Sequence, residues 1–520
     1  MVMPAWLKSC RMSTDDSLTH LSEFRALAAH YKEVAPVHMR DLFAQNPKRF
    51  DDFHLSTDGM LFDYSKNHLN DKTIGLLCDL ARARGVEALR DQMMSGARVN
   101  TTQDRRVLHT ALRAPCGIDD VDAHVLGSLE KVRALSDALR NDPAITDVIH
   151  IGIGGSDLAP RAVYHALSSM IDGPAVHYIS NIDADEIKGI LAPIDPKKIA
   201  IIVVSKSFGT LETIENAKLV KAWAPDAPVI AVSENSEAAR AFGVSDDHIL
   251  PMKDWMGGRY SVWSAAGFSL AVAFGHERFL EFLSGAAAAD EHFKTQPLER
   301  NIPALMAMIS VWCHNFYKYP AHAILPYPDG LRYFPAYLQQ LDMESNGKSV
   351  SREGKNIDYK TGPLIFGGIG TNAQHAFLQH FHQSHTITPI DFILCATTHA
   401  EPPHHHTMLN ANALGQAQAL MQGRDTMDEP HQNFPGNRPS STFILDELSP
   451  FTLGQLMAFY EHKVFVQGAI LGINCFDQWG VALGKTLAKD LISEFSAPST
   501  NIEIDSSTAG LMTYIQERSA

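Results

Sequence analysis

Residues 199–216, IAIIVVSKSFGTLETIEN, hold the pattern that decides the fold. The aliphatic run 199–204 has the length and composition of a strand buried on both faces, which is typical of a parallel sheet. Hydroxyl residues and one lysine then crowd the point where this strand gives way to a helix-like stretch. Because open α/β sheets bind ligands beyond the carboxyl ends of their strands, this loop is a candidate binding site.

The same alternation of short aliphatic runs and helical patterns continues along the chain. Strands that alternate with helices predict crossover units and parallel sheets. We therefore expect an α/β fold with two doubly wound α/β/α domains. The predicted strands are 147–153, 176–180, 198–204 and 228–233 in the first set, and 321–326, 362–366, 391–397 and 441–445 in the second. The predicted helices include 158–168, 331–341, 373–382, 406–421 and 453–471.

The chain has 520 residues, more than one ordinary hydrophobic core accommodates. Its first part reads as mostly helical, clearest at 19–34 and 72–94, and has no obvious strand series. We expect a helical segment over 1–110 packing on the larger domain, a small domain over 111–280, and a large domain over 281–520. Residues 1–11 precede a second methionine, Met12, and we interpret them as an unstructured extension or a misplaced start.

Composition excludes several classes of protein. Hydrophobic residues make up 45% and charged residues 20%, the profile of a soluble globular protein. The net charge of -15 argues against a nucleic acid or an anionic membrane as partner, but it permits a small anionic substrate. The six cysteines are scattered without C-x-x-C spacing, which indicates a reducing, cytoplasmic setting. No apolar run approaches the ~20 residues of a membrane span.

Two loops suit a bound phosphate. Glycines in Gly152–Ser156 let backbone amides approach a ligand closely. The second loop, after residue 204, leads into a helix whose N-terminus favours an oxyanion. Capping of the helix by Ser and Thr explains the same hydroxyls equally well. Neither loop is a Walker A motif or a full dinucleotide fingerprint. The polar groups of the second loop are Ser205, Lys206, Ser207, Thr210 and Thr213.

Four further stretches concentrate groups that move protons or stabilise an anion. They contain Arg259 behind two glycines, Glu344 at the end of a helical pattern, His375 in the first turn of a predicted helix, and Lys485. Each has a structural alternative, such as an ion pair between the arginine and a structural carboxylate. The run His399–His406 invites a metal interpretation, but its consecutive histidines lack the i, i+4 spacing of a zinc helix. We expect a loop before the next helix there, and no metal site.

Taken together, these stretches resemble the glucose-6-phosphate isomerase family. The resemblance covers about residues 152–485, with an additional segment at 100–113. The matching motifs stand in the family's order: GIGGSDL at 152–158, SKSFGTLET at 205–213, GGRYSVWSA at 257–265, QQLDMESNGK at 339–348, GTNAQHAF at 370–377 and FDQWGVALGK at 476–485.

The resemblance implies two sugar-isomerase (SIS-type) domains with parallel sheets, N-terminal helices and a C-terminal helical arm. It also implies a homodimer that exchanges these arms and a reaction without a cofactor. The reaction is the interconversion of glucose 6-phosphate and fructose 6-phosphate, through ring opening and a cis-enediol. Neither nucleic acid nor membrane takes part.

The resemblance also assigns roles. Glu344 is implied as the base that moves the proton between C2 and C1, and Arg259 as the cation beside the enediolate. His375, donated by the neighbouring subunit, and Lys485 are implied in ring opening. The implied phosphate ligands are Ser205, Lys206, Ser207 and Thr210, and the implied sugar contacts are Gly155, Ser156, Gly258, Gln340 and Gln478.

The sequence departs from the family pattern in places. Gly209 and Leu211 replace a threonine and a glutamine in the second loop, which removes two side-chain donors. Ser207 stands where threonine is common and keeps the hydroxyl. Three other functions stay open: a non-catalytic sugar-phosphate-binding module, an isomerase of another sugar phosphate such as mannose 6-phosphate, and a metal-dependent hydrolase that uses the histidines at 399–406. The third has the least support, and insensitivity to chelators would exclude it. The joint presence of Glu344, His375 and Lys485 favours an enzyme.

Overall fold

The computed structural model describes residues 17–426, 428–496 and 504–519. Cys10 and the segment 1–11 lie outside these ranges. The chain divides into two compact units, Met1–Cys475 and Phe476–Ala520.

A five-stranded, all-parallel sheet lies in the first unit, with the order β4-β3-β5-β6-β7. All six residues of β5 are buried, because helices cover both faces of the sheet. The chain runs from β3 outward to β4 and then returns to β5 on the other side, which places the topological switch point between β3 and β5. The strands are β3 (Asp147–Ile151), β4 (Ala175–Ile179), β5 (Ile199–Val204), β6 (Val229–Ser233) and β7 (Ile249–Pro251).

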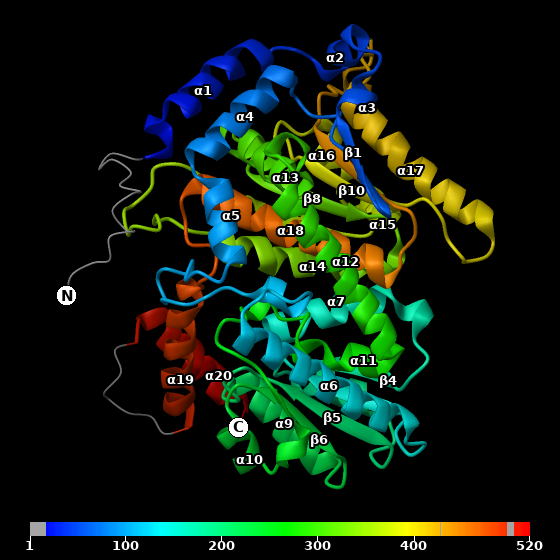
Figure 1. The fold of residues 1–520 in the computed structure, drawn as a ribbon, viewed down its shortest axis with the longest axis vertical. Helices are drawn as coiled ribbons and strands as arrows, with labels where there is room; N and C mark the ends of the chain where they lie inside the picture. Colours follow the sequence, from blue (N-terminus) through cyan, green and yellow to red (C-terminus); the bar gives the residue numbers. More distant parts are fainter. Residues whose placement is uncertain (1–16, 427, 497–503, 520) are drawn as a thin grey trace. The chain divides into compact units, whose positions relative to one another are not determined.

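Helices cover this sheet in the crossover arrangement that parallel strands require (Figure 1). Ile201, Val203 and Ala217 belong to the hydrophobic core between the sheet and its helices. The helices of this part are α6 (Asp119–Asn141), α7 (Leu158–Ala166), α8 (Ala184–Leu191), α9 (Leu211–Trp223), α10 (Ser236–Ala241) and α11 (Phe268–Phe274).

A six-stranded sheet, also in the first unit, has the order β1-β2-β11-β10-β8-β9. The strands β8 to β11 are parallel, and an antiparallel hairpin, β1 and β2, extends the sheet beside β11. A second switch point lies between β8 and β10. The strands are β1 (His54–Thr57), β2 (Met60–Asp63), β8 (Ala321–Pro326), β9 (Leu364–Gly367), β10 (Ile390–Cys395) and β11 (Ser440–Leu445).

The helix α18 (Pro450–Leu471) is buried along nearly its whole length and packs against α12 and α13. A helix that is buried on all sides is apolar on all sides, apart from polar residues that form hydrogen bonds or ion pairs with neighbouring elements. The other helices of the first unit are α1 (Ser22–Val34), α2 (Met39–Gln45), α3 (Arg49–Asp52), α4 (Asp71–Ala83), α5 (Val86–Met94), α12 (His276–Thr295), α13 (Ile302–Val311), α14 (Phe334–Leu338), α15 (Gly370–Ala376), α16 (Leu378–Gln383) and α17 (Pro403–Gln422).

The second unit contains the helices α19 (Ala482–Ser496) and α20 (Ser506–Ser519). No helix within the described ranges is long and apolar enough to cross a membrane.

The predicted fold class is confirmed: both sheets are parallel-rich and sit between helices. Five local expectations were wrong. The predicted helix over 373–382 is two helices, α15 and α16, because the backbone of Phe377 is not helical. The hairpin over 54–63 is a strand pair in a segment expected to be helical, and the 72–94 helix breaks at Gly85, whose φ is 68°. The helix over 331–341 is α14 flanked by 3-10 and π turns. The expected loop over 399–406 ends early, because α17 already begins at Pro403.

Candidate functional site

The loop Gly152–Ser156 follows β3 at the switch point of the five-stranded sheet. A Cβ atom added to Gly155 would lie 2.1 Å from the carbonyl oxygen of Gly258, so only glycine permits this backbone contact. Gly154 adopts a φ of +60°, and a Cβ there would lie 3.0 Å from Nε2 of Gln340. The loop is therefore pressed between the Gly258 backbone and the Gln340 side chain.

Arg259 lies buried and is held by Ser345, which follows Glu344, and by Cys475. Its Nε donates to Ser345 Oγ at 2.6 Å and its Nη2 to the Cys475 carbonyl at 2.8 Å. Its Nη1 lies 3.3 Å from Oε2 of Glu344. The side chain of Arg259 is only 2% exposed, whereas that of Glu344 is 20% exposed. The arginine is thus a fixed cation beside a carboxylate that is still accessible.

Glu344 ends a π-helical turn, Gln339–Glu344. Such turns are rare and are frequent at functional sites, because they redirect side chains out of the helical register. Within this turn, Asp342 forms a buried ion pair with Lys463 of α18. Lys348 Nζ donates to the main-chain carbonyl of Glu344 at 2.9 Å. The backbone that carries the Glu344 carboxylate is therefore held from two sides.

Gln340 carries a buried amide oxygen. Its Oε1 has no hydrogen-bond partner among the residues that the structure describes. Burying an amide oxygen without a partner costs roughly 1–3 kcal/mol. The nitrogen of the same amide is the atom that lies next to Gly154.

The loop Ser205–Thr210 follows β5, on the other side of the switch point. Ser205 Oγ donates to Thr210 Oγ1 at 3.2 Å, and Phe208 has a φ of 49° that bends the chain sharply into α9. Thr210 occupies the N-cap of α9 without making a side-chain capping bond, so its hydroxyl does not serve the helix. Thr213, one turn further on, is buried.

Lys206 ties this loop to the segment before Arg259. Its Nζ donates to the carbonyls of Asp254 at 2.9 Å and Met256 at 3.1 Å. An ammonium group has three donors, of which these bonds use two. Burial lowers the pKa of Lys206 below its usual value. The structure therefore brings the two loops after β3 and β5 and the 254–259 segment together.

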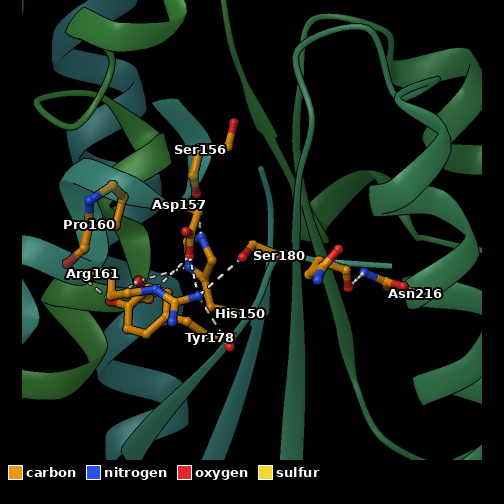
Figure 2. A network of polar contacts seen from close by, with 10 residues as sticks. His150, Ser156, Asp157, Pro160, Arg161, Tyr178, Ser180 and Asn216 are labelled. Carbon is orange, nitrogen blue, oxygen red and sulfur yellow. Dashed lines mark hydrogen bonds and ion pairs between the residues drawn. The ribbon is translucent and has the colours of Figure 1, made fainter. Parts of the chain in front are cut away.

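A buried polar network lies beneath the Gly152–Ser156 loop (Figure 2). It includes His150, Asp157 and Arg161, none of which the sequence patterns indicated as functional. Asp157 Oδ1 accepts two bonds from the Arg161 guanidinium, at 2.8 and 3.0 Å. The i, i+4 spacing of this pair is the one signal in the sequence that could have indicated it.

Three predicted residues are not brought to Glu344 within the first unit. His375 is exposed on α15, the short helix that follows β9. Gln478 and Lys485 belong to the second unit, Lys485 in the first turn of α19. Ser207 is exposed on its loop, and Ser156 is half-buried on the other.

The histidine run 399–406 makes ordinary contacts. His399 pairs with Glu447 at 3.1 Å, and His406 Nε2 donates to the Ala396 carbonyl at 3.2 Å. Across the described ranges, no three His, Cys, Asp or Glu side chains come together as possible metal ligands.

Comparison with known proteins agrees with this arrangement. A glucose-6-phosphate isomerase of Chlorobium luteolum is 44% identical, with 95% of this chain and 97% of that protein covered. One of Burkholderia pseudomallei is also 44% identical, covering 95% and 98%. The crystal structure of a glucose-6-phosphate isomerase from Chlamydia trachomatis superimposes with a TM-score of 0.87 at 33% identity, covering 96% of this chain and 100% of that one. Residues 63–512 match the family model for phosphoglucose isomerase, and the chain therefore belongs to the phosphoglucose isomerase family.

Proposed function

We infer that this protein is a glucose-6-phosphate isomerase, an enzyme that interconverts glucose 6-phosphate and fructose 6-phosphate. Relatives of this name match over nearly their full length. The single structural observation that supports the activity is the pairing of Glu344 with Arg259, 3.3 Å apart, next to the loop at Gly154 and Gly155.

In the proposed mechanism Glu344 moves one proton between C2 and C1 of the open-chain sugar. An aldose–ketose shift through a cis-enediol requires no hydride transfer, so one carboxylate over one face of both carbons suffices. Positioned acid–base catalysis of this kind contributes roughly 10²–10⁴-fold to the rate. The partial exposure of Glu344 supports this role, because the carboxylate must reach a substrate.

Arg259 stabilises the negative charge that develops on the enediolate. Its side chain is already fixed by Ser345 and Cys475 before substrate binds, so little reorganisation is needed during the reaction. A fixed donor aimed at developing charge typically contributes about 10²–10³-fold.

The remaining groups bind and prepare the substrate. We propose that the phosphate binds at the 205–210 loop, remote from the reacting carbons, where its binding energy positions them. The ligands there are Ser205, Lys206, Ser207 and Thr210, and the sugar contacts are Gly155, Ser156, Gly258, Gln340 and Gln478.

We further propose a homodimer in which His375 acts at the site of the neighbouring subunit, with Lys485, to open the pyranose ring. The exposure of His375 within its own chain supports this arrangement. No cofactor is required by the proposed chemistry. A cytoplasmic setting accords with the free cysteines at 78, 116, 313, 395 and 475.

The proposed domains are a helical segment over 1–110, a small domain over 111–280 and a large domain over 281–520 with a C-terminal arm. The five-stranded sheet takes its strands from 147–251, in support of the small domain. The six-stranded sheet takes strands from 54–63 and from 321–445.

The decisive experiment is a coupled assay of the purified protein with fructose 6-phosphate, in which a dehydrogenase detects glucose 6-phosphate. Turnover that is insensitive to a chelator is expected. A parallel assay with mannose 6-phosphate measures any activity on this C2 epimer of glucose 6-phosphate. No turnover of fructose 6-phosphate by folded protein would contradict the proposal and favour a binding module.

A further inference from the structure

The carbonyl group of Ser156 is held from inside the five-stranded sheet by a buried histidine. His150 lies on β3 and is 0% exposed. Its Nε2 is 2.7 Å from the Ser156 carbonyl oxygen. In Figure 2 the side chain of Ser156 points away from the cluster of residues that holds its carbonyl.

The contacts fix the tautomer of His150. A carbonyl oxygen only accepts hydrogen bonds, so Nε2 carries the proton and donates it. Nδ1 must then accept, and Ser269 Oγ lies 2.9 Å away as the donor. Burial lowers the pKa of His150 to about 4, which keeps the ring neutral near pH 7.

The network continues into the helices on this face of the sheet. Ser269, on α11, is fully buried, and its Oγ lies 3.4 Å from the Tyr178 hydroxyl of β4. Tyr178 in turn donates to the Pro160 carbonyl of α7 at 3.2 Å. Hydrogen bonds therefore connect the Ser156 carbonyl to His150 on β3 and, through His150, to strand β4 and to helices α11 and α7.

The residue after Ser156 is held as well. Asp157 pairs with Arg161, whose Nη2 also lies 3.3 Å from Ser180 Oγ. These contacts fix the start of α7, whereas the hydrogen bond from His150 fixes the peptide group that comes directly before it.

The loop has little room to adjust if this peptide group moves. A Cβ on Gly152 would lie 2.6 Å from the Ser156 carbonyl oxygen, so the chain folds back tightly on itself there. Gly155 is in backbone contact with Gly258, next to Arg259. A displaced Ser156 carbonyl would therefore also shift the amide and side chain that face the proposed sugar site.

We propose that His150 is a positioning residue for sugar binding: its Nε2–H holds the Ser156 carbonyl so that Ser156 and Gly155 stay aimed at the substrate. The inference rests on the proposed function, since it assigns the 152–156 loop to the sugar. Substrate recognition then has two separate parts. His150 supports the 152–156 loop, which binds the sugar, and it does not contact the 205–210 loop, which binds the phosphate.

Without the histidine, the loop would populate conformations that do not bind the sugar. The apparent affinity equals the intrinsic affinity multiplied by the fraction of molecules in the competent conformation. Loss of a buried hydrogen bond to a carbonyl corresponds to roughly a tenfold change in such a population. We therefore expect KM to rise, with kcat changed much less, because the Glu344–Arg259 pair remains in place.

The test compares His150→Leu and His150→Gln in the full-length protein. His150→Leu should raise KM for fructose 6-phosphate roughly tenfold and change kcat by less than about threefold. His150→Gln, whose amide Nε2 can donate to the same carbonyl, should recover most of the loss. Competitive inhibition by inorganic phosphate reports on the 205–210 loop alone, and its inhibition constant should stay within about twofold.

A matched control is His177→Leu. His177 lies on the neighbouring strand β4 and pairs with Asp147 at 2.7 Å, away from the loop. This variant should keep the wild-type KM. If His150→Leu does not fold, Ser269→Ala replaces it, since it removes the donor to Nδ1 and should raise KM by a few-fold.

Two outcomes would overturn the proposal. One is a folded His150→Leu protein whose KM stays within about twofold of wild type. The other is a parallel rise of KM and of the phosphate inhibition constant, which would indicate a general distortion. A wild-type protein without isomerase activity is a different result, and it would contradict the proposed function instead.

Discussion

Nη1 of Arg259 lies 3.3 Å from Oε2 of Glu344, and the two residues come from opposite parts of the first unit. The arginine is on the segment that follows the five-stranded sheet, and the glutamate is on the π turn after β8 of the six-stranded sheet. Both were predicted as candidates independently, each with an ordinary structural alternative. The alternative for Arg259 was an ion pair with a structural carboxylate, and the carboxylate that it contacts is the predicted base.

Replacement of Glu344 by glutamine should remove catalysis and preserve binding. The amide keeps the shape of the side chain and an acceptor for Arg259, but it cannot take up a proton. We expect kcat to fall by roughly 10²–10⁴-fold, with the affinity for fructose 6-phosphate, measured by calorimetry, changed by only a few-fold. Glu353→Gln, at an exposed position, is the control with wild-type turnover. A kcat for Glu344→Gln near that of the control would exclude the residue as the base.

The pKa of Lys206 predicts how phosphate binding depends on pH. Burial lowers this pKa below 10.5, so the ammonium loses its proton earlier than an exposed lysine as the pH rises. Between about pH 8 and about pH 10, where inorganic phosphate stays a dianion, the inhibition constant for phosphate should rise. Lys206→Arg should show a flatter profile, since a guanidinium stays charged over this range.

Unfolding does not explain such a loss of binding. The folded pKa of Lys206 is below the unfolded one, so the unfolded state binds more protons in the interval between the two values. The contribution of this lysine to the free energy of unfolding therefore rises with pH there. Thermal melts over the same range serve as the check, and a profile for Lys206→Arg as steep as that of wild type would contradict the assignment.

Two glycines offer a matched pair of substitutions. A Cβ on Gly155 would lie 2.1 Å from the Gly258 carbonyl oxygen, whereas a Cβ on Gly209 would have its nearest neighbour at 3.7 Å. Gly155→Ala should therefore raise KM for fructose 6-phosphate by at least about tenfold, because the loop must shift against the segment that carries Arg259. Gly209→Ala should bind substrate normally. Equal KM values for the two variants would show that the backbone contact at Gly155 is not important for binding.

The strand pattern made most of the fold predictable. Residues 199–204 are aliphatic throughout because both faces of β5 are covered, and their short length and β-branched residues favour a strand. The hairpin at 54–63 has a local signal that was missed, the two-residue turn Asp58-Gly59 between its strands. Only its pairing with β11, across nearly 400 positions, is hidden from local patterns. The π turn at Glu344 was missed because the helical pattern continues through it and only the backbone geometry distinguishes the two.

Family motifs predicted the residues of the proposed site, but no motif indicated the buried residues that support them. His150 reads as one more residue in a buried strand, and its polar role depends on Ser269, more than a hundred positions away. Lys463 is likewise hidden in the apolar α18, where its partner Asp342 comes from another element. Sequence patterns report on groups that face a ligand in a shared motif, whereas buried partners are decided by tertiary contacts.

A mixed dimer tests whether His375 acts across the subunit interface. Glu344→Gln and His375→Ala proteins should each be nearly inactive, His375→Ala more so on closed-ring glucose 6-phosphate than on an open-chain analogue. If His375 comes from the neighbouring subunit, a dimer of one subunit of each kind contains one site in which both residues are intact. Random reassociation of the two variants should then restore about a quarter of wild-type activity. If His375 instead acts within its own chain, every site in the mixed dimer lacks one residue and activity stays at the level of the single variants.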